Sequence, residues 1–159
     1  MARLLEGTPT KYLIGLRTVV LTDAAGLNHD QRRAKTLSRG KKVSIRRCRG
    51  LYHHATRAEP AWIELFIDNI MLYYPLVVLR VPFFADIVIG QIFFHELGHH
   101  IHNTQAPEFR EREDVAENWK KRLGKPYYRR AYWYWLPIAY LLYPFFWLIK
   151  KLWPSYEQD

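Results

Sequence analysis

Two histidines in the second half of the chain constrain its fold more than any other feature. His95 and His99 are four residues apart, and the residues before them are apolar and suited to a helix. On a helix, side chains four residues apart leave the same face, one turn from each other. Two imidazoles placed in this way can bind one tetrahedral zinc ion, so the spacing predicts a metal-binding helix.

Glu96 follows His95 directly and projects from the edge of the same helix face. From there its carboxylate can reach a water molecule on the metal without binding the metal, and zinc lowers the pKa of such a water to about 7. Glu96 is therefore predicted to be a general base, which takes a proton from the water and later passes it to a leaving amine. Without a metal, two histidines and a glutamate would be costly to bury in an apolar helix.

A second helix is predicted to bring the third ligand to this pair. The first helix is expected from Pro82 to about His102, because a proline suits the first turn. The second is expected from about Glu108 to Leu123. It has acidic residues in its first turns and basic residues in its last, followed by Gly124 and Pro126.

Glu113 on the second helix is the predicted third ligand. Glu113 and Glu117 are four residues apart and flank Ala116, whose small side chain would let the two helices approach closely. Glu117 is predicted to accept a hydrogen bond from a ligand histidine, because metal-bound imidazoles usually donate to a carboxylate. Asp114 is the alternative for this supporting role, and the spacing leaves open which of the three carboxylates binds the metal.

The pattern resembles the gluzincin branch of the zincin metallopeptidases. The resemblance covers about residues 50–123 and rests on His95-Glu96-Leu97-Gly98-His99 followed by Glu113-Asp114-Val115-Ala116-Glu117. Gluzincins carry HExxH and a downstream ExxAD or ExxxD. Here the last acid is a glutamate, and only 13 residues separate His99 from Glu113. The resemblance implies a zinc-dependent metallopeptidase that hydrolyses peptide bonds, with Zn²⁺ held by His95, His99 and Glu113, and Glu96 as the base.

The sequence predicts an α+β chain, with strands first and the two helices after them. The predicted strands are Tyr12–Leu21, Lys42–Arg46, Gly50–His54 and Ala61–Ile67. The resemblance implies a small zincin-like fold, in which a short antiparallel or mixed sheet packs on the metal-binding helix and one edge strand holds the peptide substrate. Gly50–His54 or Ala61–Ile67 would be that strand, and three of their side chains are candidates for stabilising an oxyanion: Tyr52, His53 and His54.

The net charge of +9 is concentrated near the N-terminus. Residues 31–50 contain nine basic residues and no acidic residue. The stretch 32–49 would suit anionic lipid head groups, at about 1 kcal/mol per basic residue near the surface. It would also suit nucleic acid phosphates, although it lacks the interleaved aromatic residues that stack on single-stranded bases. A third interpretation is a plain solvated surface.

The C-terminal part of the chain is strongly aromatic. Residues 132–149 carry no charge and are flanked by basic pairs on both sides. At about 27 Å as a helix, this run is slightly short of a hydrocarbon core of roughly 30 Å, and Pro137 and Pro144 would kink it. We expect a zincin-like domain over 1–126 and a membrane-associated tail over 127–159, which is either a short span or an interfacial segment. The alternative is a hydrophobic element packed on the domain or on a partner.

No run of signal-peptide length is present at the N-terminus, so the expected location is the cytoplasmic side of a membrane. Cys48 is the one cysteine, which excludes a disulfide scaffold. The arginines beside it would lower its pKa, but no partner motif supports catalysis, and an inert thiol is expected. The alternatives to a peptidase are a zincin-fold regulatory or binding protein and a nucleic-acid-associated protein that uses the basic stretch.

Overall fold

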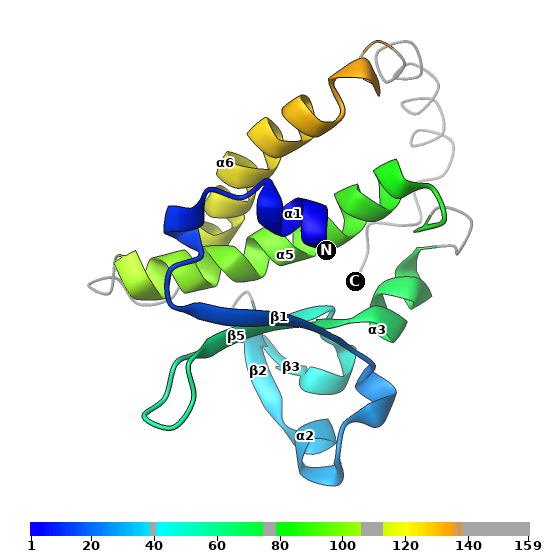
Figure 1. The fold of residues 1–159 in the computed structure, drawn as a ribbon. Helices are drawn as coiled ribbons and strands as arrows, with labels where there is room; N and C mark the ends of the chain where they lie inside the picture. The colour runs from blue at the N-terminus through cyan, green and yellow to red at the C-terminus, as the bar shows by residue number, and fades with distance from the viewer. Residues whose placement is uncertain (39–40, 75–78, 106–112, 136, 138–159) are drawn as a thin grey trace. The chain divides into compact units, whose positions relative to one another are not determined.

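The structure is a computed structural model that describes residues 1–38, 41–74, 79–105, 113–135 and 137 (Figure 1). The chain forms two compact units, Met1–Tyr127 and Tyr128–Asp159. The described part of the second unit contains the last turn of helix α6 (Glu113–Ala131) and a short 3-10 helix, η4 (Trp133–Trp135). The first unit contains the sheet and the predicted site.

A three-stranded mixed sheet forms the centre of the first unit. Strand β5 (Ala61–Phe66) lies between β1 (Leu16–Thr22), which runs parallel to it, and β4 (Gly50–His53), which runs antiparallel. Ile63, Leu65 and Phe66 of β5 are fully buried, as expected of a central strand with both faces covered. The predicted α+β class and mixed sheet are confirmed.

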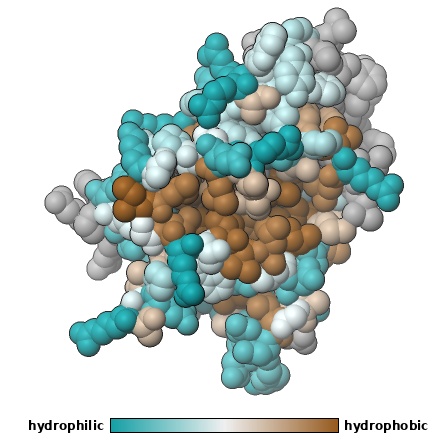
Figure 2. Space-filling model, viewed as in Figure 1, coloured by the Kyte–Doolittle hydropathy of each residue, from teal (hydrophilic) through white to brown (hydrophobic). Residues whose placement is uncertain are grey.

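Helix α5 (Pro82–Gln105) covers one face of this sheet and contacts both β4 and β5 (Figure 1). Its buried residues include both apolar and polar side chains, because the sheet lies on one side of the helix and α6 on the other. Those that form the core are Phe93, Phe94, Leu97 and Ile101. Figure 2 shows hydrophobic residues gathered over β1 and the adjacent part of α5.

The opposite face of the sheet is covered by short elements from the N-terminal third of the chain. A small cluster joins Phe66 and Leu51 of the sheet to the 3-10 helices η2 (Ala24–Gly26) and η3 (Ile45–Arg47). Nearby are helix α2 (His29–Arg33), which begins with a capping box at Asn28, and a separate two-stranded ribbon of β2 (Lys35–Ser38) and β3 (Lys41–Ser44). The described part of the basic stretch is therefore mostly folded into α2, the ribbon and η3.

The bounds of all four predicted strands differ in the structure, by one residue for β4 and β5 and by more for β1 and β3. β1 starts at Leu16 rather than Tyr12, because Thr10–Tyr12 forms the 3-10 helix η1. β3 ends at Ser44, where η3 begins. Both differences occur where local hydrogen bonds turn the chain at the end of an alternating pattern. Helices α1 (Ala2–Glu6) and α3 (Ile67–Tyr73) were not predicted.

The first predicted helix has its expected start and continues three residues beyond His102 to Gln105. The predicted end of the second helix at Leu123 is wrong, because α6 continues through Pro126 to Ala131. A proline within a helix removes one hydrogen bond, and tertiary packing can offset that loss. Here the next residue, Tyr127, is buried, and its ring lies 5.7 Å from that of Phe94 on α5. The predicted start at Glu108 lies outside the described residues.

Most of the predicted membrane segment, residues 136 and 138–149, also lies outside the described residues. Among the helices that are described, none is both long enough and apolar enough to cross a membrane.

Candidate metal centre

Helix α5 places His95 and His99 together, as their spacing predicts. Their rings meet edge to face with centroids 4.9 Å apart. The side chain of His95 is 20% exposed and His99 is 8% exposed, so one edge of the pair is accessible and the other is buried. Two imidazoles in this arrangement can direct nitrogen atoms at one point beside the helix.

Glu113, at the start of α6, completes the group. The ligand atoms of His95, His99 and Glu113 all lie within 4.8 Å of one another, so the three side chains could hold a metal ion. Glu113 Oε2 lies 3.1 Å from His95 Nε2. This oxygen is fully buried, and no hydrogen bond from the described residues satisfies it. Two nitrogen ligands and a carboxylate form a donor set that zinc accepts.

A close crossing of α5 and α6 brings Glu113 to the histidines. A β-carbon on Gly98 would lie 2.7 Å from the carbonyl oxygen of Ala116 and 2.8 Å from its α-carbon. Ala116 itself has no exposed surface. The helices therefore touch backbone to backbone at this point, and the predicted role of Ala116 as a small contact residue is confirmed.

The other two predicted carboxylates lie differently. Glu117 Oε2 is 3.7 Å from His95 Nδ1, so Glu113 and Glu117 face the two nitrogens of the same ring. Asp114 is exposed and is not part of the group. Of the three carboxylates that the sequence left open, the structure brings Glu113 to both histidines.

Lys120, which the sequence did not single out, contacts Glu117. Its Nζ lies 2.7 Å from Glu117 Oε2. Partial burial raises the pKa of Glu117, but the hydrogen bond and charge of Lys120 outweigh this and hold the pKa below its usual value. Glu117 is thus kept ionised as a hydrogen-bond acceptor beside His95. This contact could have been predicted from the sequence, because Lys120 is three residues after Glu117 on the same helix and side chains at that spacing are neighbours.

Burial lowers the pKa of His95 below its usual value, and the neighbouring His99 acts in the same direction. Glu113 and Glu117 oppose this shift without reversing it. His95 is therefore mainly neutral at pH 7, which is the form of imidazole that binds metals.

Glu96 lies between α5 and β4 and is 8% exposed. A β-carbon on Gly50, the first residue of β4, would lie 2.8 Å from Glu96 Oε1 and 2.9 Å from its Cγ. Because Gly50 has no side chain, there is space beside it for the Glu96 carboxylate. The sequence marked Gly50 only as the start of a strand.

Of the three oxyanion candidates, Tyr52 faces α5. Its hydroxyl lies 3.2 Å from His100 Nδ1 and 3.4 Å from Asn103 Nδ2. His100 is fully buried, and its Nε2 lies 3.0 Å from the carbonyl oxygen of Ile14. His100 thus joins β4 to the segment before β1, a role that sequence analysis missed. His54 is exposed, and its ring meets that of Tyr52 edge to face.

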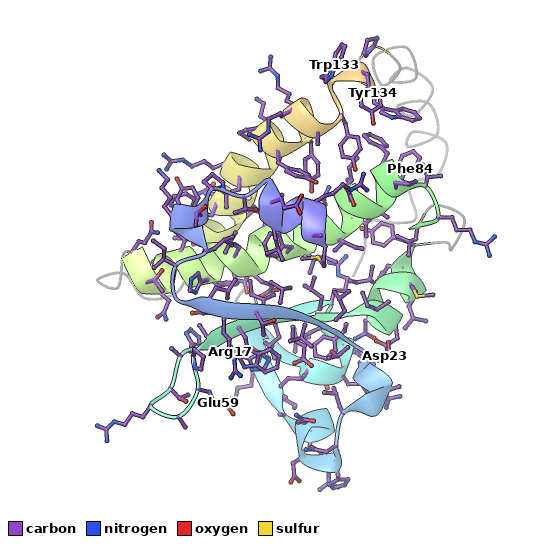
Figure 3. The ribbon with its side chains drawn as sticks, viewed as in Figure 1. Arg17, Asp23, Glu59, Phe84, Trp133 and Tyr134 are labelled. Carbon is purple, nitrogen blue, oxygen red and sulfur yellow. The ribbon has the colours of Figure 1, made fainter. Side chains whose placement is uncertain are left out.

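His53 points to the other face of the sheet, because successive side chains of a strand alternate. Its Nε2 lies 3.0 Å from Glu64 Oε2, and Thr22 donates a hydrogen bond to the other oxygen of Glu64. The His53 ring stacks on Trp62 with centroids 3.8 Å apart. Trp62 also lines an open cavity of about 560 Å³ together with Arg17 and Glu59, two residues that Figure 3 labels.

Cys48 lies just before β4, and its expected electrostatics are corrected by the structure. Burial raises the pKa of Cys48 to about 11, and the negative charges of Glu96 and Glu113 add to the shift. The neighbouring arginines were expected to lower this pKa, but Arg46, Arg47 and Arg49 are exposed, where solvent screens their charge. The predicted inert thiol fits this environment.

Comparison of the chain with protein-family models, with curated proteins and with solved structures finds no match. The observation that points to a function is therefore the group of His95, His99 and Glu113 between two long helices.

Proposed function

We propose that the protein is a zinc-dependent metallopeptidase. The observation that carries the proposal is the convergence of His95, His99 and Glu113, whose ligand atoms lie within 4.8 Å of one another. Glu96 supports hydrolysis rather than metal storage, because a site that only holds a metal has no need for a glutamate directly after the first ligand histidine. The resemblance of this pattern to gluzincins supports the same reaction.

A bound zinc ion would supply a Lewis acid and a water molecule with a pKa of about 7. The proton transfers and the orientation of the ligands depend on residues of the chain. Glu96 takes the proton of the attacking water and passes it to the leaving amine, so that peptide hydrolysis is balanced in protons. The Glu117 carboxylate lies 3.7 Å from Nδ1 of the His95 ring, and the Glu113 carboxylate lies 3.1 Å from Nε2, so a carboxylate beside Nδ1 favours the ring orientation that keeps Nε2 toward Glu113.

The substrate would bind as an extended peptide along β4. Support comes from the order of the described strands, in which β4 lies at one edge of the sheet, where a further strand could pair with it. β4 also begins at Gly50, which lies against Glu96. A peptide paired with β4 would therefore pass beside the proposed base.

Metal content and cleavage, measured together on the same preparations, test the proposal. Wild type should contain about one zinc per chain. His99→Ala and Glu113→Ala should lose it, whereas Glu96→Gln should keep zinc and lose cleavage of a peptide library by at least about 100-fold. Absence of zinc from wild type would refute the metal site. Zinc without cleavage in wild type would favour a regulatory or binding protein with a zincin-like site.

A further inference from the structure

A basic and apolar surface lies at the end of the sheet where α3 follows β5. The last turn of α3 exposes three apolar side chains, with exposed fractions of 39% for Met71, 81% for Leu72 and 63% for Tyr73. Apolar side chains of this size are usually buried. Three consecutive exposed ones form an apolar patch rather than an isolated surface residue.

A segment from a distant part of the sequence that carries three arginines is joined to α3. Asn69 of α3 is buried, and its Nδ2 donates hydrogen bonds to the carbonyl oxygens of Arg46 and Cys48, at 2.8 and 2.7 Å. The guanidinium of Arg49 lies 5.2 Å from the centre of the Tyr73 ring. We call the resulting surface the α3–η3 patch, and it consists of Arg46, Arg47, Arg49, Met71, Leu72 and Tyr73.

The fold holds the two halves of the patch together. Asn69 joins the backbone of the arginine segment to α3, and Asp68 joins the start of α3 to the residues after β1 by accepting hydrogen bonds from the N–H groups of Ala24 and Ala25. The side chains of Arg46, Arg47 and Arg49 are exposed, and residues 31–50 contain no acidic residue. The guanidinium of Arg49 thus lies beside the apolar end of α3, and the backbone of Arg46 is held against the same helix.

We propose that the α3–η3 patch docks the protein on an anionic lipid surface. Leucine and tyrosine side chains insert into the boundary between head groups and acyl chains, and tyrosine is enriched there because its ring is apolar and its hydroxyl is polar. Arginines around them contact the lipid phosphates. Nucleic acid would match the arginines alone, because its phosphate backbone offers nothing to the 81% exposed Leu72.

A fluorescent probe that responds to polarity tests this docking in the full chain. The probe is attached at Leu72→Cys or, as the control, at Ile14→Cys, both in a Cys48→Ser background. Ile14 is 69% exposed and precedes β1 at the opposite end of the sheet, so it controls for membrane binding by other parts of the chain. Vesicles of phosphatidylcholine alone are compared with vesicles that also contain phosphatidylserine.

The emission at position 72 should shift to the blue with anionic vesicles and stay unchanged with neutral ones, and the probe at position 14 should not shift. Arg46→Gln and Arg49→Gln should each weaken vesicle binding by about fivefold. Arg57→Gln, an exposed arginine in the β4–β5 connection, should leave it unchanged.

An equal shift at both positions, or no shift at position 72, would overturn the proposal. So would an equal response to neutral and anionic vesicles. The protein could instead bind duplex DNA through the arginines, with no change in the emission of the probe at position 72 when vesicles are added. In that case the partner would be a nucleic acid and the lipid proposal would be wrong.

Discussion

At the scale of single residues, the structure assigns importance to a glycine that carries no chemistry of its own. Gly50 and Glu96 are far apart in the sequence, yet a β-carbon at position 50 would lie 2.8 Å from Glu96 Oε1 and 2.7 Å from Ile92 Cγ2, too close for either side chain to stay in place. The motif identifies Glu96 as the base, but its orientation depends on a neighbouring strand.

Gly50→Ala should therefore impair catalysis without removing the metal. The new β-carbon would push the Glu96 carboxylate aside, and a displacement of about 1 Å can cost about 100-fold in rate. Zinc content should stay unchanged, since no ligand is touched, and peptide cleavage with metal analysis measures both effects. Gly26→Ala is the control, because nothing lies within 4 Å of a β-carbon there. Full activity in Gly50→Ala would show that Glu96 is not held by β4.

Asp68 gives a pH dependence at the same scale. Burial raises its pKa, but hydrogen bonds from the backbone N–H groups of Ala24, Ala25 and Asn69 outweigh burial and hold the pKa below its usual value. Because the folded pKa is below the unfolded one, the stabilisation is full above about pH 4 and is lost as the pH falls through the folded pKa.

Asp68→Asn should cost about 1 kcal/mol in the free energy of unfolding at neutral pH, because solvent screens part of the charge and the amide oxygen of Asn can still accept one hydrogen bond. This difference from wild type should shrink below about pH 4, as denaturant titrations over a pH series would show. Glu59→Gln, at an exposed acid, is the control. A difference that stays constant down to pH 2 would contradict the assigned role of the carboxylate.

At the scale of elements, the crossing of α5 and α6 decides whether the metal group exists. The helices touch at Gly98 and Ala116, so Glu113, three residues before Ala116, lies beside His95. The spacing of residues within each helix was evident from the sequence. The end of α6 was not, because Gly124 and Pro126 are ordinary stop signals that the packing of Tyr127 overrides.

Gly98→Ala should separate the two helices, because its β-carbon would meet the backbone of Ala116. We expect zinc affinity to fall by about tenfold or more, measured by competition with a chelator, since Glu113 moves away from the histidines. Overpacking costs about 1–3 kcal/mol, and the better helix propensity of alanine offsets about 1 kcal/mol of it. Gln91→Ala on the exposed side of α5 is the control. Unchanged zinc affinity would mean that Glu113 is not a ligand.

At the scale of the whole molecule, the proposed metal couples the site to folding. Glu113 and the two histidines come from separate helices, and their ion would join α5 to α6. A ligand that binds only the folded state stabilises it according to its free concentration.

Free zinc at 100 times its dissociation constant should therefore raise the free energy of unfolding of wild type by about 2.7 kcal/mol. Thermal melts with zinc and with a chelator measure the difference. Glu113→Gln should lose most of this effect, while Asp114→Asn should keep it, because Asp114 is exposed and outside the group. The reverse result would identify Asp114 as the ligand.

The sequence by itself determined the features that depend on short-range periodicity. Four-residue spacing on a helix places His95 beside His99 whatever the surrounding fold, and the same rule relates Glu113 to Glu117. The short strands β4 and β5 were also predicted from their local sequence, to within one residue at the C-terminal end. Tertiary structure decided which carboxylate meets both histidines, that Gly50 makes room for Glu96, and that Asn69 joins the backbone of Arg46 and Cys48 to α3. These features are contacts between segments far apart in the chain, and no local pattern encodes the distance between such segments.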